Sequence, residues 1–217
     1  MYDFKNFTVA WEGKESTIGT KIKKLIKKPE PAKYKIVMAN YKIRSMISKL
    51  DVFIERLRER DRALFEKVVD ALITKDTTRA TMYANEIAEI RKMVKQLTIT
   101  QVALEQISLR LETVEIFGNI MTALVPVIGV VKELKGILKG VMPTMSFELA
   151  EVEEVLRDVV IESGSVVGTG VSEFYTSPEA RKILEEAKVI AEQRMKEKFP
   201  ELPSITTPSA EGAKAPT

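Results

Sequence analysis

The side chains that most often perform catalysis at neutral pH are missing from this 217-residue chain, which contains neither histidine nor cysteine. Without them the sequence cannot form a serine–histidine or cysteine–histidine nucleophile pair, and it lacks the usual general base and the commonest metal ligand. Disulfides and thiolate metal sites are excluded for the same reason, which fits a reducing compartment. Any chemistry would therefore depend on carboxylates, hydroxyls and amines.

Three segments that carry such groups superficially resemble ligand-binding motifs. EGKEST at residues 12–17 lacks the first glycine of a phosphate-binding loop, because Thr8 stands in that position. GSVVGTG at residues 164–170 follows no predicted strand and has the wrong spacing for dinucleotide binding. The acidic residues between 151 and 158 could hold a divalent cation, but a solvated helix face explains them better. We therefore expect no catalytic residue, no cofactor and no bound metal, and the sequence does not indicate an enzyme.

Charge is distributed unevenly along the chain, although the formal total is only +3. Residues 1–62 contain 16 Lys and Arg against 8 Asp and Glu, a net charge of +8, whereas residues 63–217 carry a net charge of −5. A basic front half attracts anionic surfaces, and an acidic rear half can fold over it or meet a neighbouring molecule. This asymmetry favours a reversible assembly protein over a catalyst.

Two long segments free of glycine and proline, residues 32–73 and 78–117, carry apolar side chains at steps of three and four. That spacing predicts two long helices, each packed along one seam. The polar residues between them allow a tight reversal, with Asp76 or Thr77 as the N-cap of the second helix. We therefore expect an all-α fold, a long antiparallel helical hairpin with additional C-terminal helices. The seam residues are Ile43, Ile47, Leu50, Ile54, Leu57, Asp61, Leu64, Val68 and Ala71 in the first helix and Tyr83, Ile87, Ile90, Val94, Leu97, Gln101, Leu104, Ser108 and Leu111 in the second.

Beyond residue 117 glycine and proline recur, so we expect a kinked or conditionally helical extension with hinges near Gly118 and Gly140. An acidic helix is expected over residues 146–162. A last helix should begin with Ser177 as N-cap and Pro178 at the first helical position, and should run to about residue 199. The most apolar window, residues 116–131, is shorter than the ~20 residues that cross a bilayer, and no secretory signal is visible. These observations predict a soluble, cytoplasmic protein.

The same boundaries divide the chain into four regions. Residues 1–31 are expected to form an amphipathic and basic membrane-contact segment. The hairpin and its extension, residues 32–145, are the expected polymerisation core. Acidic regulatory helices follow over residues 146–198, and residues 199–217 form a tail that is expected to be disordered when alone.

The first eleven residues, MYDFKNFTVAW, place aromatic side chains at intervals compatible with a helix, and a lysine cluster follows them. Such a segment can insert shallowly among headgroups while its lysines hold anionic lipid, at about 1 kcal/mol for each basic residue. Equally, the aromatic residues could cap the core of the hairpin. Nucleic acid ranks lower as a partner, because the cluster contains no recognisable reading motif. The expected membrane-contact residues are Phe4, Phe7, Trp11, Lys21, Lys23, Lys24, Lys27 and Lys28.

The second helix of the hairpin carries more apolar residues than one seam requires. Later helices could cover the surplus, or part of it could pack against another copy of the chain. On the second interpretation, the polymer-contact residues are Met93, Ile99, Val102, Ile107 and Val114.

The tail begins with FPELPSI, in which apolar anchors alternate with prolines. Proline favours an extended conformation and reduces the entropy lost when such a segment docks into a groove. An inert polar tail is the alternative. We favour a docking motif, formed by Phe199, Pro200, Leu202, Pro203 and Ile205.

Taken in order, these elements resemble the ESCRT-III superfamily, and most closely its archaeal branch of CdvB-like cell-division proteins. The resemblance spans residues 1–205 through the order of elements rather than through one motif. The chain differs from the largest members in lacking a winged-helix domain after the tail, which suggests a shorter paralogue. The segments that carry the resemblance are MYDFKNFTVAW, the basic arm KIRSMISKLDVFIERLRERDRALFEKVV, the second arm EIAEIRKMVKQLTITQVALEQISLRLETVEIF, the acidic helix ELAEVEEVLRDVV and the proline-containing tail.

The resemblance implies membrane remodelling. Such proteins change from a closed monomer, with the acidic C-terminal part folded back, to an open form that polymerises on membrane. In the archaeal branch the polymers constrict the division neck and take part in vesicle release, and a AAA ATPase with an MIT domain recognises short C-terminal motifs and disassembles them. The expected partners are other copies of the chain, paralogous subunits, anionic membrane lipids and that ATPase, and the expected place is the inner face of the membrane at the division site. A helical adaptor that never polymerises is the alternative.

Overall fold

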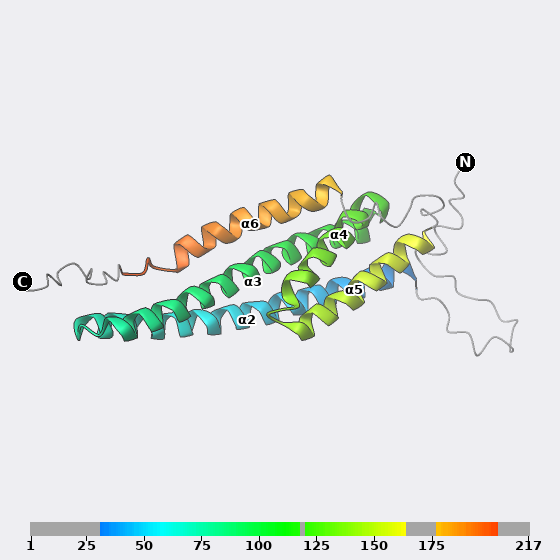
Figure 1. The fold of residues 1–217 in the computed structure, drawn as a ribbon. Coiled ribbons are helices and arrows are strands. Elements are labelled where there is room, and N and C mark those ends of the chain that lie inside the picture. The colour runs from blue at the N-terminus through cyan, green and yellow to red at the C-terminus, as the bar shows by residue number, and fades with distance from the viewer. Residues whose placement is uncertain (1–30, 118–119, 164–176, 204–217) are drawn as a thin grey trace, which may run out of the picture.

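The computed structural model describes residues 31–117, 120–163 and 177–203, whose arrangement appears in Figure 1. Within these ranges the chain is helical and contains no strand, which confirms the expected all-α fold. Two long helices form an antiparallel hairpin, two shorter helices pack at its open end, and the last helix runs back along the second arm. The helices are α2 (Ala32–Ile73), α3 (Thr77–Phe117), α4 (Ile120–Leu138), α5 (Pro143–Glu162) and α6 (Pro178–Lys198).

The two arms of the hairpin begin and end within one residue of the predicted positions. Helix α2 contains 42 residues and α3 contains 41. Asp76 is the N-cap of α3, since its Oδ1 accepts a hydrogen bond from the backbone N–H of Arg79 at 3.0 Å. Lys75 adopts a left-handed conformation, with φ at 59°, which is uncommon outside glycine and here completes the reversal.

The predicted stripes form the seam between the arms. Most of their aliphatic residues are fully buried, and each such side chain contributes about 1.5–3 kcal/mol relative to an exposed one. Ile47, Leu57 and Leu64 are partly buried at the edge of the same core. The seam therefore confirms the helical periodicity that the sequence predicted.

Polar side chains within the seam fix the register of the arms. Asp61 is buried, with 1% of its surface exposed, and Arg91 donates hydrogen bonds to both of its carboxylate oxygens at 2.7 and 3.1 Å. Sliding one arm by a helical turn would leave this carboxylate buried without its cation, which costs about 3–5 kcal/mol. Two further pairs bridge the arms nearer the open end, Gln101 with Asp51 at 2.5 Å and Ser108 with Asn40 at 2.7 Å.

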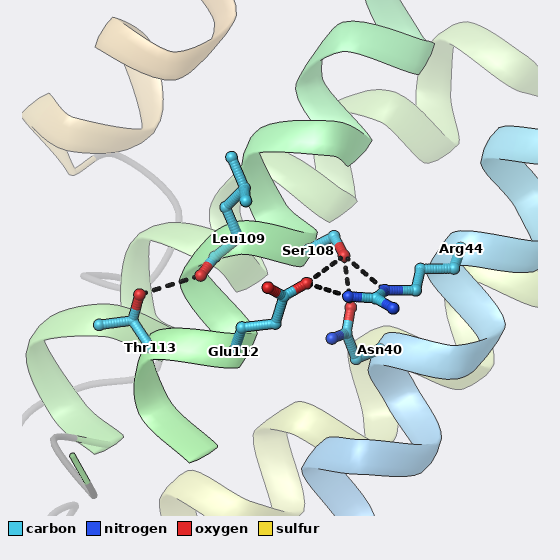
Figure 2. A network of polar contacts seen from close by, with 6 residues as sticks. All are labelled: Asn40, Arg44, Ser108, Leu109, Glu112 and Thr113. Atoms are coloured by element: carbon cyan, nitrogen blue, oxygen red, sulfur yellow. Dashed lines mark hydrogen bonds and ion pairs between the residues drawn. The ribbon is translucent and has the colours of Figure 1, made fainter. Parts of the chain in front are cut away.

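Figure 2 shows the network nearest the open end. The Ser108 hydroxyl donates to Asn40 Oδ1 and accepts a hydrogen bond from Arg44 Nε at 3.4 Å. The same guanidinium pairs with the Glu112 carboxylate, and this hydrogen bond holds the pKa of Glu112 below its usual value. These contacts join α2 to α3 in the open half of the seam, and Ile36 and Val114 are still buried beyond them.

Helix α4 is continuous across Pro126. The glycines and Pro126 predicted a kinked or conditionally helical extension, and one helix runs from Ile120 to Leu138 with Pro126 inside it. Burial outweighs the poor helix propensity here, because most apolar side chains from Leu124 to Leu138 are enclosed by neighbouring helices. The expected break near Gly140 is confirmed as the turn between α4 and α5, whereas Gly118 lies outside the described residues.

The rear helices, defined as α4, α5 and α6, share one hydrophobic core with the open half of the hairpin. Helix α5 begins at Pro143, three residues before the predicted start. Helix α6 begins as predicted, with the Ser177 hydroxyl accepting a hydrogen bond from the backbone N–H of Ala180 at 3.1 Å. No helix among the described residues is long and apolar enough to cross a membrane.

Replacing Arg91 by methionine tests how far the Asp61–Arg91 pair holds the register. The variant leaves the Asp61 carboxylate buried without a cation, so the free energy of unfolding should fall by about 3–5 kcal/mol. Adding Asp61→Leu removes the buried charge and continues the apolar seam, so the double variant should regain most of that loss. Urea unfolding followed by circular dichroism measures both. An Arg91→Met protein as stable as the parent, or a double variant no better than the single one, would contradict this account.

Candidate functional site

Helix α5 lies along the first half of α2 and is joined to it by three ion pairs, which we call the ladder. The three lysines of the ladder are seven residues apart and so lie on one face of α2. Their partners on α5 follow in descending order, which makes the two helices antiparallel. The pairs are Lys35 Nζ with Glu162 Oε1 at 2.6 Å, Lys42 Nζ with Glu151 Oε2 at 2.7 Å and Lys49 Nζ with Glu148 Oε1 at 2.7 Å.

Each pair of the ladder is weak alone, because the side chains are partly or largely exposed and salt screens them. The hydrogen bond and charge of Lys42 hold the pKa of Glu151 below its usual value. A carboxyl group whose pKa is lowered by folding stabilises the folded arrangement above its unfolded pKa, and this contribution is lost as the pH falls through the lowered value. The attraction between Lys42 and Glu151 is therefore complete at neutral pH, and it decreases as salt is added.

Glu153 faces α4 instead of α2. Its side chain is buried and accepts hydrogen bonds from Lys135 Nζ at 2.7 Å and from Arg157 Nη2 at 2.9 Å. The Ser146 hydroxyl also donates to the backbone oxygen of Lys135 at 3.0 Å. The acidic residues of α5 are thus divided between two faces of the helix, and the described ranges contain no group of acidic residues that could hold a metal ion.

Helix α6 packs on α3 through a narrow seam. Its buried residues are mostly alanines, which remove little apolar surface from water. The Lys95 ammonium pairs with Glu192 at 2.8 Å and holds the pKa of that carboxyl group below its usual value. A longer contact of 3.5 Å joins Arg194 to Glu105. Leu184 and Met195, which are partly buried, add apolar contact at the edge of this seam.

The tail residues that follow α6 lie against the hairpin at Arg91. The ring of Phe199 lies 5.3 Å from the guanidinium carbon, a cation–π distance. Arg91 Nη1 also donates a hydrogen bond to the backbone oxygen of Pro200 at 2.7 Å. One guanidinium therefore neutralises Asp61 inside the seam and holds the start of the tail outside it. Of the other predicted docking residues, Leu202 and Pro203 are half-buried and Ile205 lies outside the described residues.

The chain's own fold covers the residues of α3 that were predicted to contact another copy. Val102, Ile107 and Val114 are fully buried, and Met93 and Ile99 are partly buried against the same core. In this conformation the alternative interpretation, coverage by later helices, accounts for the buried residues. A polymer contact through them requires the rear helices to leave α3, and it stays a prediction.

The residues predicted to contact membrane, Phe4, Phe7, Trp11 and the five lysines from Lys21 to Lys28, lie outside the described residues. The lysines of the ladder and Arg91 were not among the predicted site residues. The sequence contains a pattern that could have indicated each of them. Lysines repeated every seven residues mark one charged helix face, and a single Asp61 on an apolar stripe requires a cation on the opposite arm.

The chain is similar to cell-division proteins of Sulfolobus acidocaldarius. The chain is 56% identical to Cell division protein B1 over 201 residues, which cover 92% of this chain and 91% of that protein. It is 36% identical to Cell division protein B over 168 residues, 77% of this chain and 64% of that protein, and 32% identical to Cell division protein B3 over 164 residues, 76% and 90%. No family model and no solved structure matches the chain. On this identity, extending over almost the whole length of both chains, the protein belongs to the CdvB family of cell-division proteins.

Proposed function

We propose that this protein is the subunit of a polymer that assembles on anionic membrane and remodels it in cell division and vesicle release. The observation that carries the proposal is the ladder, in which weak, salt-sensitive ion pairs lay an acidic helix along a basic arm. The names of the relatives support the process, cell division. In this proposal the described conformation is the closed monomer, and the open form acts at the inner face of the membrane at the division site.

Opening would free two kinds of surface. Release of α5 exposes the lysines of the ladder, and each basic residue near an anionic lipid surface contributes about 1 kcal/mol. Movement of the other rear helices exposes Val102, Ile107 and Val114, which then offer apolar area to a neighbouring copy or a paralogous subunit. Attraction to membrane and attraction between subunits thus increase together.

In this proposal the tail binds a partner only in the open form. Arg91 holds Phe199 and Pro200 while α6 lies on α3, so the segment of residues 199–205 is free for a partner only after α6 has left. We assign that partner to an ATPase of the AAA class with an MIT domain, which would then remove open subunits from the polymer. Closed monomers would escape it.

Reversing the acidic side of the ladder tests the central step. The change Glu148→Lys, Glu151→Lys and Glu162→Lys replaces attraction to α2 by repulsion, so the open form should gain population. Filaments on anionic vesicles should then appear at a severalfold lower protein concentration, as measured by sedimentation and electron microscopy. Adding Lys35→Glu, Lys42→Glu and Lys49→Glu restores opposite charges across the ladder and should return the threshold toward that of the parent. Glu59→Lys, Glu66→Lys and Asp70→Lys make the same change in charge on exposed positions far from α5 and provide the control.

The same experiment separates the proposal from its rival, a helical adaptor that never polymerises. The adaptor accounts equally well for apolar residues of α3 that are buried in a monomer. It predicts that the opened variant stays monomeric and does not bind anionic vesicles at low salt. That result would contradict the proposal that the protein is a polymer subunit. Binding that increases only as much as in the charge control would also count against the ladder.

For the tail, Leu202→Ala combined with Pro203→Ala should weaken binding of the opened variant to the isolated MIT domain severalfold, because an anchor and a pre-ordered residue are both lost. Isothermal titration measures the affinity. Lys196→Ala, on the exposed side of α6, should leave it unchanged. If the opened variant and the same protein with both alanine substitutions bind the MIT domain with equal affinity, this segment is not the ATPase-binding site.

A further inference from the structure

The outer side of the seam between α2 and α5 carries two apolar hollows. One, of about 300 Å³, lies between Tyr34 and Met38 on α2 and Val152 and Val155 on α5. The other, of about 450 Å³, is farther along α2 and is lined by Val52 and Phe53 with two methionines at the start of α5. We call the two hollows and the face of α2 between them the outer groove. Its main residues are Tyr34, Met38, Tyr41, Val52, Val155 and Met142.

Exposed apolar side chains of α2 lie beside both hollows of the outer groove. Tyr34, Tyr41 and Val52 are 50%, 69% and 54% exposed. With Met38 they follow the helical repeat on the side of α2 opposite the core, over a length of roughly 27 Å at 1.5 Å per residue. Ser45, Ser48 and Lys49 separate Tyr41 from Val52 on this face, so the exposed apolar side chains form two patches, one at each hollow. Exposed apolar patches beside such hollows mark a site that another segment covers.

We infer that the outer groove binds the chain's own first eleven residues, MYDFKNFTVAW, and so keeps their aromatic side chains away from membrane while the monomer is closed. This inference rests on the proposed function. It adds a second consequence to the release of α5, because Val152 and Val155 form one wall of the groove. When α5 leaves α2, the groove loses that wall and the aromatic segment becomes free to enter a lipid headgroup layer.

The length of the chain before α2 allows this contact. Residues 12–30 form a connection of 19 residues, which can reach about 60 Å when extended. The groove begins within one turn of the start of α2 and is less than half that long. A tether of this length gives the segment an effective concentration in the millimolar range, so it occupies the groove ahead of a second copy at ordinary protein concentrations.

Charge favours the same occupant. The connection contains six lysines and three glutamates. Four of the lysines lie between residues 23 and 28, shortly before α2. At that end of the seam α5 presents exposed Glu154 and Asp158, and Asp158 lines the nearer hollow. Among the described residues neither carboxylate takes part in an ion pair. A basic connection crossing this end of α5 would neutralise them.

Trp11 is the only tryptophan of the chain, so its fluorescence reports directly on this contact. In the full-length protein without lipid, we expect a blue-shifted emission that acrylamide quenches poorly. Met38→Lys with Val52→Lys places two charges in the groove at positions that are already partly exposed, and should shift the emission to the red and raise the quenching constant severalfold. Ile73→Lys with Met82→Lys, at exposed apolar positions near the hairpin turn, adds the same charge and should change neither. Circular dichroism confirms that all three proteins remain helical.

Three results would overturn the inference. Trp11 of the parent could prove as accessible to acrylamide as a tryptophan in an unstructured peptide. Its protection could persist unchanged in the groove variant, which would place the segment elsewhere. Protection that grows with protein concentration would assign the groove to a second copy. None of these results bears on filament formation by the opened ladder variant, so this inference and the proposed function can fail separately.

Discussion

Attraction between the basic face of α2 and the acidic face of α5 is the interaction on which the proposed behaviour of this protein depends. It has two components of different character. Apolar residues of α5, among them Leu149 and Leu156, are completely buried and supply most of the favourable free energy of packing. The ladder adds ion pairs whose strength changes with salt, with pH and with the approach of another anionic surface. In the proposed function, this contact persists in solution and is displaced by a membrane that offers the lysines many new partners.

The contacts of Arg91 and of α6 are consistent with rear helices that can be released from a stable hairpin. Arg91 contacts both Asp61 in the seam and Pro200 in the tail. The side chain that fixes the register of the arms therefore also holds the residues that follow α6. Helix α6 packs on α3 through Ile183 and three buried alanines, and two ion pairs join the same helices. In the proposed function, the hairpin remains intact while the rear helices exchange between docked and free positions. This is the separation of a rigid core from detachable parts that an assembly switch requires.

Much of this fold could be predicted from the sequence because its local signals agree with its packing. The apolar steps of three and four, the cap at Asp76 and the Ser177–Pro178 start each specify one feature, and each is present. Helix α4 was harder, because its glycines and proline argue against a helix that tertiary burial nevertheless stabilises. Pairings distant in sequence were beyond local reasoning. Nothing near Lys42 names Glu151 as its partner, and nothing near Phe199 indicates that Arg91 lies beneath its ring.

The absence of native cysteine makes a direct measurement of the central claim possible. Ser45→Cys on α2 and Glu154→Cys on α5, both exposed, can carry spin labels across the seam. Pulsed electron paramagnetic resonance of the labelled full-length protein should give one short, narrow distance in solution. On anionic vesicles the account predicts a shift to a long, broad distribution as α5 leaves α2. Protein that is bound to the vesicles and keeps the short distance would contradict it.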